Sequence, residues 1–480
     1  MELRQRLSRW ARPVAYFGTN PISVVGAVLT TSAGIMLVAF WAFDLFGGRP
    51  IHPYAGIVLF LILPGLFVLG LVLMPIGLWW RRRSIRRRGE VPAEYPPVHL
   101  SRPALRNAAM FVAVATILNL AIVGTGTYRG IEYMDSQQFC GMTCHKVMAP
   151  EFSAYLATPH SHVACVECHI GPGATWFLRA KLTGTRQLIA VTRDTYSRPI
   201  PVPVHQLRPA QETCEHCHWP RRFVGDKLVI KTKYSDDEAN TPLVTVLLMK
   251  VGGHGAGGPT GIHGRHVDEA GRVSFVSNEG RRLVIPAVRY LDDAGKMVDF
   301  LSEDAGGKPP AEGERRTMDC MDCHNRPAHT FELPDRAVDD ALTAGAISRA
   351  LPFVRKKSVE LLKTEYPDRD TAQRELGERL AEYYRKEYPK IYESRRSEID
   401  AAGAQIQAIY ERNVFPNMKV TWGTYPNHLG HEAFPGCFRC HDDKHKAADG
   451  RVIKQDCDAC HTVVAMEESN PKILADLGMR

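Results

Sequence analysis

The chain has 480 residues and a formal net charge of +8, and 45% of its residues are hydrophobic. This length predicts several domains rather than one small one. The positive charge does not indicate nucleic-acid binding, because much of it lies in two N-terminal arginine clusters and no basic stripe is interleaved with aromatic residues on a recognisable binding module.

Three uncharged runs lie near the N-terminus, at residues 22–43, 54–80 and 107–128. Each is long enough to cross the roughly 30 Å hydrocarbon core of a membrane as a helix. We therefore predict a membrane domain over residues 1–128 with three transmembrane helices, the second kinked at Pro64 or Pro75. A cleaved signal peptide is the alternative for the first run, but that run exceeds the usual apolar core and lacks a small-residue cleavage site before Asp44.

Arginines flank the first two predicted spans. Four of them, Arg4, Arg6, Arg9 and Arg12, precede the first span, and the segment RRRSIRRR (Arg81 to Arg88) follows the second. Arginine-rich segments stay on the cytoplasmic side of a membrane. The N-terminus is therefore expected in the cytoplasm of a bacterium, with the chain anchored in the inner membrane and residues 129–480 in the periplasm.

The twelve cysteines form six pairs, and a histidine follows each pair directly. In a C-x-x-C-H site the two thiols bind the vinyl groups of a c-type haem and the histidine binds the iron. Histidine makes up about one residue in 25, so six of six is not chance. Zinc sites or disulfides are the alternative explanation of the pairs. The predicted haem attachment residues are Cys140, Cys144, Cys165, Cys168, Cys214, Cys217, Cys320, Cys323, Cys437, Cys440, Cys457 and Cys460, and the predicted iron ligands are His145, His169, His218, His324, His441 and His461.

After the predicted membrane domain we expect a domain with haems one to three at 129–221, a β-rich insertion at 222–303, and a helical domain with haems four to six at 304–480. The expected fold is thus three transmembrane helices followed by a periplasmic multihaem domain, mainly α with little regular structure, that contains a small β-rich insertion. Residues 335–412 predict two or three helices, with a break at Tyr366 and Pro367. The glycine-rich stretch at 252–264 predicts a flexible loop that brings His254, His263 or His266 to an iron.

Six irons need a second axial ligand, and bis-histidine ligation is a common solution in electron-transfer haems. The candidates that we favour are His160, His205, His263, His329, His431 and His445, and the other histidines outside the motifs and after the third span are His162, His216, His254, His266 and His428. His329 and His445 follow motif histidines too closely to bind the same iron. Each is expected to serve a neighbouring haem.

The first motif, FCGMTCHKVM, has one extra residue between its cysteines and a methionine, Met148, three residues after His145. A thioether ligand raises the potential of a haem relative to two imidazoles. Cys140 comes twelve residues after the third predicted span, so this haem is expected near the membrane surface, where it could meet a quinol. The alternative is that Met148 only packs against the haem or the membrane.

The stretch from the third span to about residue 220 resembles the NapC/NirT family of membrane-anchored quinol dehydrogenases. The segments EYMDSQQFCGMTCHKVM, TPHSHVACVECH and FLRAKLTGTRQ carry this resemblance. It implies that Met148 replaces the motif histidine at the first haem, although the family methionine usually lies one residue nearer, and that His160 binds another haem. The chain departs from the smaller members of this family in its two additional spans, its β-rich insertion and its six motifs. In these features it resembles the larger inner-membrane cytochromes that pass quinol electrons toward extracellular acceptors.

The resemblance also implies a quinol pocket built from a basic residue and an acid that follow the second motif. Arg179 and Lys181 match the basic part, whereas Gln187 occupies the approximate place of the acid. The proton acceptor is then expected among the acidic residues Glu132, Asp135, Glu151 and Glu167.

The expected function is oxidation of quinol or menaquinol by an inner-membrane hexahaem cytochrome, a quinol dehydrogenase of anaerobic or extracellular respiration. Its partners would be the membrane quinol pool and periplasmic cytochromes or a terminal reductase, without nucleic acid, and it could form homo- or hetero-oligomers. One alternative is an electron conduit or anchor in a larger complex whose partner oxidises the quinol. Another is a terminal reductase that acts at an open-sided haem.

Overall fold

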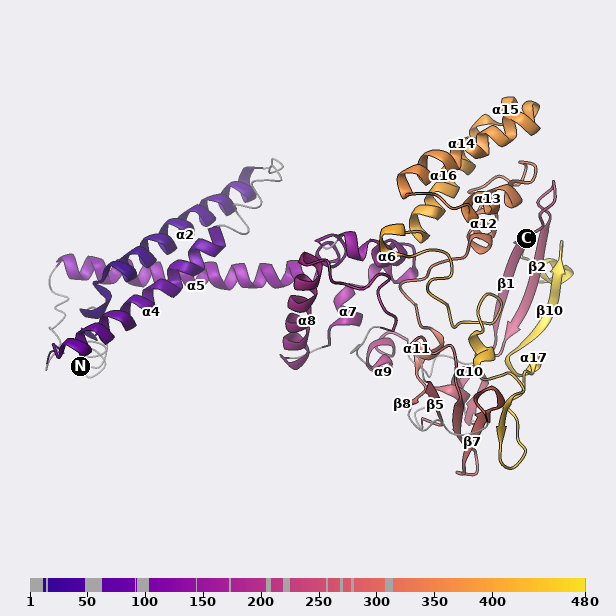
Figure 1. Cartoon of the computed structure of the whole chain (residues 1–480), viewed down its shortest axis with the longest axis horizontal. Helices are drawn as coiled ribbons and strands as arrows, with labels where there is room; N and C mark the ends of the chain where they lie inside the picture. Colours follow the sequence, from indigo (N-terminus) through magenta and orange to yellow (C-terminus); the bar gives the residue numbers. More distant parts are fainter. Residues whose placement is uncertain are drawn as a thin grey trace. The chain divides into compact units, whose positions relative to one another are not determined.

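The computed structural model describes residues 12–13, 16–47, 63–90, 92, 103–143, 145–171, 174–203, 209–218, 225–255, 258–267, 271–277, 280–306 and 314–479. The chain divides into two compact units, residues Met1–Met134 and Asp135–Arg480 (Figure 1).

The first unit contains three long helices, α2 (Pro21–Gly47), α4 (Leu63–Arg88) and α5 (Pro103–Met134). Within the described residues, two stretches are long and apolar enough to cross a membrane, Pro21–Ala39 and Leu63–Arg88. They overlap the first two predicted spans, 22–43 and 54–80, and α5 is helical over the third. The first third of the second run, residues 54–62, lies outside the described residues.

Small residues bring α2 and α4 together. A Cβ added to Gly26 would lie 2.7 Å from the carbonyl oxygen of Gly70, so glycine permits this approach of the two backbones. The Ser23 hydroxyl donates a hydrogen bond to the carbonyl oxygen of Met74 at 2.8 Å, which also joins the two helices. Between them lies a small apolar core that includes Phe67.

The second unit begins with short helical segments that carry the first three motifs. These are the π turn η2 (Phe139–Thr143), α6 (His145–Leu156), η3 (Pro159–His162), α7 (Cys165–His169), α8 (Ala174–Thr192) and α9 (Ala210–Cys214). The later motifs also sit on single turns, α11 (Cys320–Cys323), η7 (Gly436–Arg439) and α17 (Cys457–Cys460). No residue of α7 or α17 is buried, so these turns contribute little to an ordinary apolar core.

Strands of residues 227–317 pair with strands from the C-terminal region. One sheet has the order β1-β2-β10 and another β8-β5-β6-β7-β9, and both are antiparallel in every pair. The strands are β1 (Lys227–Tyr234), β2 (Pro242–Met249), β5 (Val273–Ser277), β6 (Ala287–Leu291), β7 (Met297–Ser302), β8 (Glu314–Thr317), β9 (His445–Ala447) and β10 (His461–Glu468), with a small hairpin β3 (Gly253–Gly255) and β4 (Gly258–Thr260). The β-rich segment therefore shares its sheets with the polypeptide around motifs five and six.

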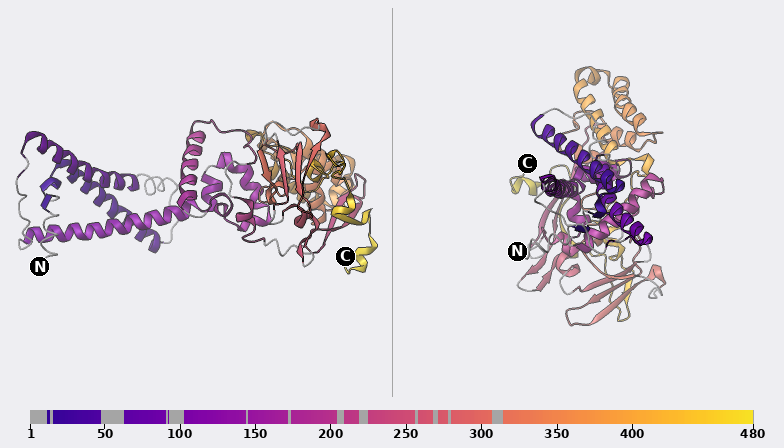
Figure 2. Two further views of the ribbon diagram at one scale, coloured as in Figure 1. Left: turned by 90° about the horizontal axis from the view of Figure 1, so that it is seen from below. Right: turned by 90° about the vertical axis from the view of Figure 1, so that its left-hand side faces the viewer.

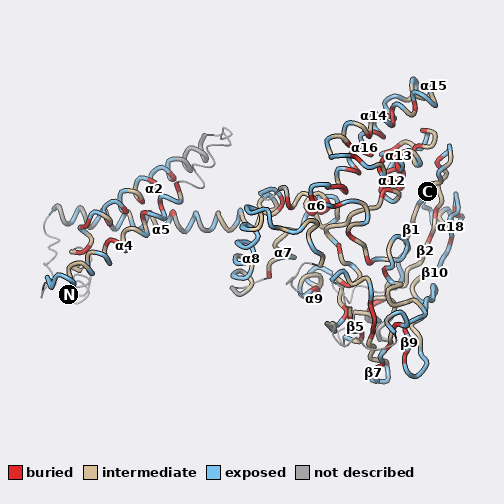
Figure 3. The backbone as a smooth tube through the Cα atoms, in the orientation of Figure 1, coloured by how far each residue is buried: buried red, intermediate tan, exposed pale blue. Residues whose placement is uncertain are grey.

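Residues 334–413 form five helices rather than the two or three expected, because proline and glycine turns interrupt the pattern more often. They are α12 (Pro334–Thr343), α13 (Val354–Lys363), α14 (Arg369–Glu387), α15 (Pro389–Ser394) and α16 (Arg396–Asn413). The expected break at Tyr366 and Pro367 falls between α13 and α14. This helical segment has its own apolar core, visible as buried residues along α12, α13, α14 and α16 in Figure 3.

The helical segment and the five-stranded sheet lie at opposite ends of the second unit (Figure 2). Three further short elements are η5 (Glu303–Ala305), η6 (Pro416–Met418) and α18 (Lys472–Asp476).

Candidate functional site

Five motif histidines each lie opposite a histidine from elsewhere in the second unit. Their ring centroids are 5.8 to 6.3 Å apart. The pairs, with the motif histidine first, are His169 with His329 at 6.2 Å, His218 with His160 at 6.0 Å, His324 with His263 at 6.3 Å, His441 with His266 at 5.8 Å, and His461 with His431 at 6.2 Å.

This spacing fits two imidazoles on opposite sides of one metal. Metal bonds to imidazole nitrogen are about 2.0 Å long, so two rings that flank one metal ion have centroids roughly 6 Å apart. Direct ring packing would not require the same separation in five independent pairs. The donor set of one motif histidine and one distant histidine is that of a bis-histidine haem iron.

Hydrogen bonds orient several of these rings. The Nδ1 atoms of His160, His329 and His441 donate to the carbonyl oxygens of Pro327, Glu151 and Lys454 at 3.1, 2.9 and 3.1 Å, and His266 Nδ1 donates to Ile262 O at 2.8 Å. A carbonyl oxygen only accepts, so the proton is on Nδ1 in each ring. The Nε2 lone pair is then left to bind a metal.

The zinc alternative finds no support in the described parts of the chain. There, no three histidine, cysteine, aspartate or glutamate side chains gather where they could hold a metal ion. Structural zinc usually takes four protein ligands. The eleven cysteines that the structure describes are all free thiols, which also gives no support to disulfides.

Consecutive motifs are neighbours in space. Cys165 of motif two lies beside Cys140 of motif one, and Cys214 of motif three lies beside Cys320 of motif four. Cys168 is close enough to Cys214, and Cys437 to both Cys323 and Cys460, for these thiols to interact electrostatically. The six motifs thus follow one another in the order of the sequence.

The histidine pairs cross this order. His329, which follows motif four, lies opposite the histidine of motif two, and His160, which precedes motif two, lies opposite the histidine of motif three. Neither His329 nor His160 could be assigned to its iron from its position in the sequence. Each pair ties together segments that are distant along the chain.

One short helix, α10 (Gly261–His266), carries two of the opposing histidines. His263 and His266, three residues apart, face the histidines of motifs four and five. The glycine-rich stretch that precedes α10 allows this turn, since Gly261 has a φ of +64° and its α-carbon packs against Gly252.

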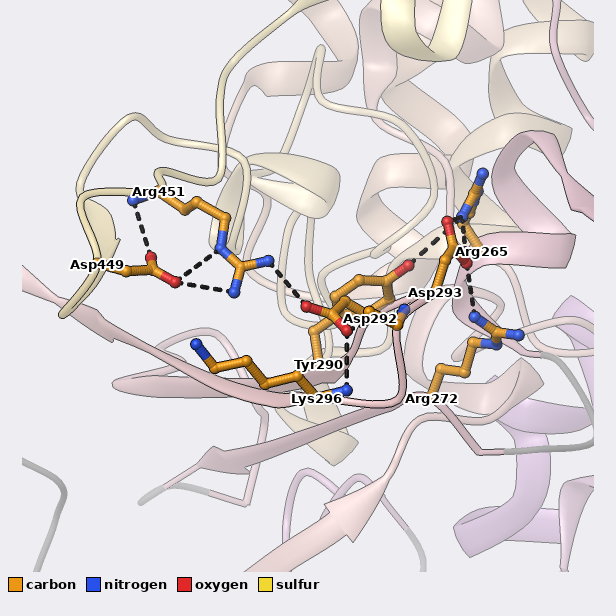
Figure 4. Close-up of polar contacts among 9 residues, drawn as sticks. Arg265, Arg272, Tyr290, Asp292, Asp293, Lys296, Asp449 and Arg451 are labelled. Atoms are coloured by element: carbon orange, nitrogen blue, oxygen red, sulfur yellow. Dashed lines mark hydrogen bonds and ion pairs between the residues drawn. The ribbon is translucent and has the colours of Figure 1, made fainter.

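Charged residues fix α10 to the turn between β6 and β7 (Figure 4). Arg265 donates to Asp293 at 3.0 Å, and Arg272 donates to the same carboxylate at 2.7 Å. The two arginines lower the pKa of Asp293 below its usual value, Arg265 more than Arg272. Beside them Arg451 bridges Asp292 and Asp449, which joins the same turn to the segment after motif five.

Motif four begins with a capping box. The Asp319 carboxylate accepts from Met321 N at 2.9 Å, and the Asp322 carboxylate accepts from Asp319 N at 2.8 Å. Burial, and then the charge of Asp319, raise the pKa of Asp322, and the neighbouring Arg316 and Arg282 oppose this effect. These contacts hold the turn that carries Cys320 and Cys323.

Four of the six favoured distal histidines lie opposite a motif histidine, namely His160, His263, His329 and His431. The assignment of His445 is wrong. Its Nδ1 bonds with Asp442 at 2.9 Å and its Nε2 with the carbonyl oxygen of Ile285 at 2.8 Å, so neither nitrogen can take an iron. His205 and the side chain of His254 lie outside the described residues.

His266 lies opposite a motif histidine but was not among the six distal ligands that we favoured from the sequence. It was one of three histidines expected to reach an iron from the glycine-rich stretch, and its spacing from His263 was the available signal. The structure places it opposite His441.

The extra residue of the first motif coincides with a π turn. Residues Phe139–Thr143 form η2, and a π turn holds one more residue than an α turn. Gly141 is buried in η2 with its α-carbon against the ring of Phe152, so a side chain here would clash. Met148 is half-buried on α6, one turn after His145. Cys144 and the side chain of His145 lie outside the described residues.

Glu151 connects α6 to the segment of His329. Its carboxylate accepts from Arg326 at 2.7 Å, and both side chains are buried. Arg326 also donates to His329 O at 2.6 Å and lies over the ring of Tyr425 at 4.2 Å. Glu151 is therefore engaged in a buried ion pair and is not free to accept a proton from a quinol, contrary to one of our expectations.

The residues expected at a quinol pocket make separate contacts, unlike the paired histidines described above. The guanidinium of Arg179 lies over the ring of Trp176 at 5.4 Å, and Gln187 is exposed two turns later on α8. Glu132 pairs with Arg129 at 2.7 Å. Asp135 is half-buried and Glu167 is exposed. The side chain of Lys181 lies outside the described residues, and no contact between Arg179, Asp135 and Gln187 occurs in the part of the chain that is described.

Two comparisons relate this chain to known proteins. Residues 102–212 match the N-terminal region of the NapC/NirT cytochrome c family. The chain is also 40% identical over 469 residues to the cytochrome c-type protein ImcH of Geobacter sulfurreducens. The aligned region covers 96% of this chain and 90% of ImcH. The chain belongs to the NapC/NirT cytochrome c family. It is similar to ImcH over nearly its whole length, so the expected likeness to a larger cytochrome of this type is confirmed.

As a NapC/NirT cytochrome, the chain is a membrane-associated electron-transfer protein with covalently bound haem. The family match begins just before α5 and ends in α9, so it includes the first two motifs. No solved structure matches the chain.

Proposed function

We propose that this NapC/NirT cytochrome binds six c-type haems, oxidises a membrane quinol such as menaquinol near the first motif, and delivers the electrons to a periplasmic acceptor. The observation that supports it best is the set of five histidine pairs with centroids about 6 Å apart on motifs that neighbour one another in sequence order.

The residues present fit the cofactor. Each described motif histidine faces one other imidazole, and the cysteines of each motif are the attachment chemistry of a c-type haem. When bound, the haems supply one-electron redox chemistry. The protein supplies the axial donors, the carbonyl groups that fix the orientation of those donors, and the order of the motifs.

Membrane topology is part of the proposal. The arginine-rich end of α4 and the arginines before α2 favour a cytoplasmic N-terminus in the bacterial inner membrane. Residues 129–480 would then be periplasmic, which is where c-type haem is attached.

Quinol oxidation releases two electrons and two protons, so its pocket needs a hydrogen-bond donor and a proton acceptor beside a redox centre. Arg179 and Lys181 are our candidates for the donor, and Asp135 and Glu132 for the acceptor, with Gln187 as a further polar residue. Met148 is our candidate for an axial ligand of the first haem. The resemblance of this region to the family, and the family match over residues 102–212, support that assignment.

The test is anaerobic mixing of the purified full-length holoprotein with a reduced menaquinol analogue, followed by stopped-flow absorbance of the haems. We expect rapid haem reduction that a quinone-site inhibitor blocks. Reduction by dithionite but not by quinol would refute a quinol site in this chain and favour the electron conduit. A terminal reductase would instead show a high-spin haem that binds nitrite or CO, whereas the five histidine pairs favour haems with both axial positions filled.

A further inference from the structure

The end of α4 that carries the arginines has a cavity of about 500 Å³. Its described lining is Trp79, Arg82, Arg83, Arg86 and Arg87. Residues four apart lie one above the other on a helix, so 82 and 86, and likewise 83 and 87, place two adjacent rows of guanidinium groups on one face.

The positive charge of this cavity is not balanced within the described residues. No carboxylate there forms an ion pair with Arg82, Arg83, Arg86 or Arg87. Four like charges around one space repel each other, and an anion from outside would relieve this repulsion. Arg81 differs, because it donates to Thr19 Oγ1 at 2.9 Å and lies over the ring of Tyr16 at 5.7 Å.

The position of the cavity identifies the kind of anion. The arginines directly follow the apolar part of α4, and Trp79 and Trp80 are 58% and 51% exposed at the junction. Exposed tryptophan at the end of an apolar helix marks the depth of lipid head groups. The guanidinium carbon of Arg83 lies 5.1 Å from the centroid of the Trp79 ring, and this contact with the ring uses none of the N–H groups that could donate to an acceptor.

We propose that this cavity binds the phosphate of an anionic phospholipid. Arginine donates two parallel hydrogen bonds to a phosphate, so two or more of the four side chains can hold one head group. The surface potential of an anionic leaflet adds to this attraction. Such a site would anchor α4 at a fixed depth and is independent of the proposed quinol chemistry.

The experiment measures lipid binding to the full-length holoprotein by native mass spectrometry from detergent. We expect phosphatidylglycerol or cardiolipin to remain bound and phosphatidylcholine to be lost. The variant Arg83→Gln/Arg87→Gln should weaken retention of the anionic lipid at least tenfold. The matched control Arg81→Gln/Arg88→Gln removes the same charge from residues that do not line the cavity and should bind as the wild type does.

Two results would overturn the proposal. One is equal retention of the anionic lipid by both double variants, which would make the binding a general charge effect. The other is displacement of the lipid by inorganic phosphate at similar concentrations, which would indicate a site for free phosphate. Should Arg83→Gln/Arg87→Gln not insert into the membrane, Arg83→Lys/Arg87→Lys keeps the charge but loses the paired donors. We expect it to retain the anionic lipid severalfold less well than the wild type, and retention equal to the wild type would contradict the proposal.

Discussion

The imidazole of His169 lies 6.2 Å, centroid to centroid, from that of His329, although two further motifs separate these residues along the chain. His329 Nδ1 donates a hydrogen bond to the carbonyl oxygen of Glu151 at 2.9 Å, so Nε2 is the nitrogen left for a metal. Three parts of the chain, α6, motif two and the segment after motif four, therefore meet at one proposed haem.

We predict opposite effects on haem spin state for substitutions of His266 and His445. Replacing His266 by alanine should remove a proposed axial ligand and convert one haem from low spin to high spin, which electron paramagnetic resonance would detect. Replacing His445 by glutamine should leave every haem low spin. It should cost about 1–3 kcal/mol of stability, because buried hydrogen bonds to Asp442 and Ile285 are lost. A spin change in the His445 variant alone would reverse our assignment.

Glu151→Gln should destabilise the protein strongly. Breaking a buried ion pair by removing one charge typically costs about 3–5 kcal/mol, and here it leaves Arg326 buried without its partner. Because Arg326 also bonds His329 O, we expect altered axial geometry at the proposed second haem, seen as a shifted low-spin signal. Arg336→Gln is the control, since its ion pair with Asp340 is exposed. Equal losses of stability in both variants would contradict this interpretation.

Asp293→Asn tests how α10 is held. The carboxylate binds Arg265 and Arg272, so its loss should loosen the helix that carries His263 and His266. We expect the midpoint potentials of two haems to change in redox titration, with little change in Tm because the ion pairs are exposed. Asp299→Asn removes a similar exposed pair with Arg289 on neighbouring strands and should leave all potentials unchanged. Unaltered potentials in both variants would remove Asp293 from the positioning of α10.

Met148→Leu tests the first motif. If the thioether binds iron, leucine of similar volume should change the spectrum and potential of one haem and slow reduction by quinol. The control is Met142→Leu, an exposed methionine within the π turn. Normal spectra and rates in the Met148 variant would exclude it as a ligand.

Local sequence determined the parts of this protein whose chemistry is local. A cysteine pair with an adjacent histidine contains the attachment groups and one axial donor of a c-type haem, so five C-x-x-C-H motifs and one longer motif identify a multihaem cytochrome. Apolar runs and arginine clusters likewise indicate membrane segments, because the lipid core and the membrane surface act on consecutive residues.

The partners of the motif histidines were decided only by the tertiary structure. A second axial donor comes from the opposite side of the iron, and any segment that folds there can supply it. Our interpretation of the sequence favoured His445 over His266, but folding placed His445 between Asp442 and Ile285 and turned α10 toward motifs four and five. Sequence spacing does not say which iron a histidine faces, because it records distance along the chain and not across the fold.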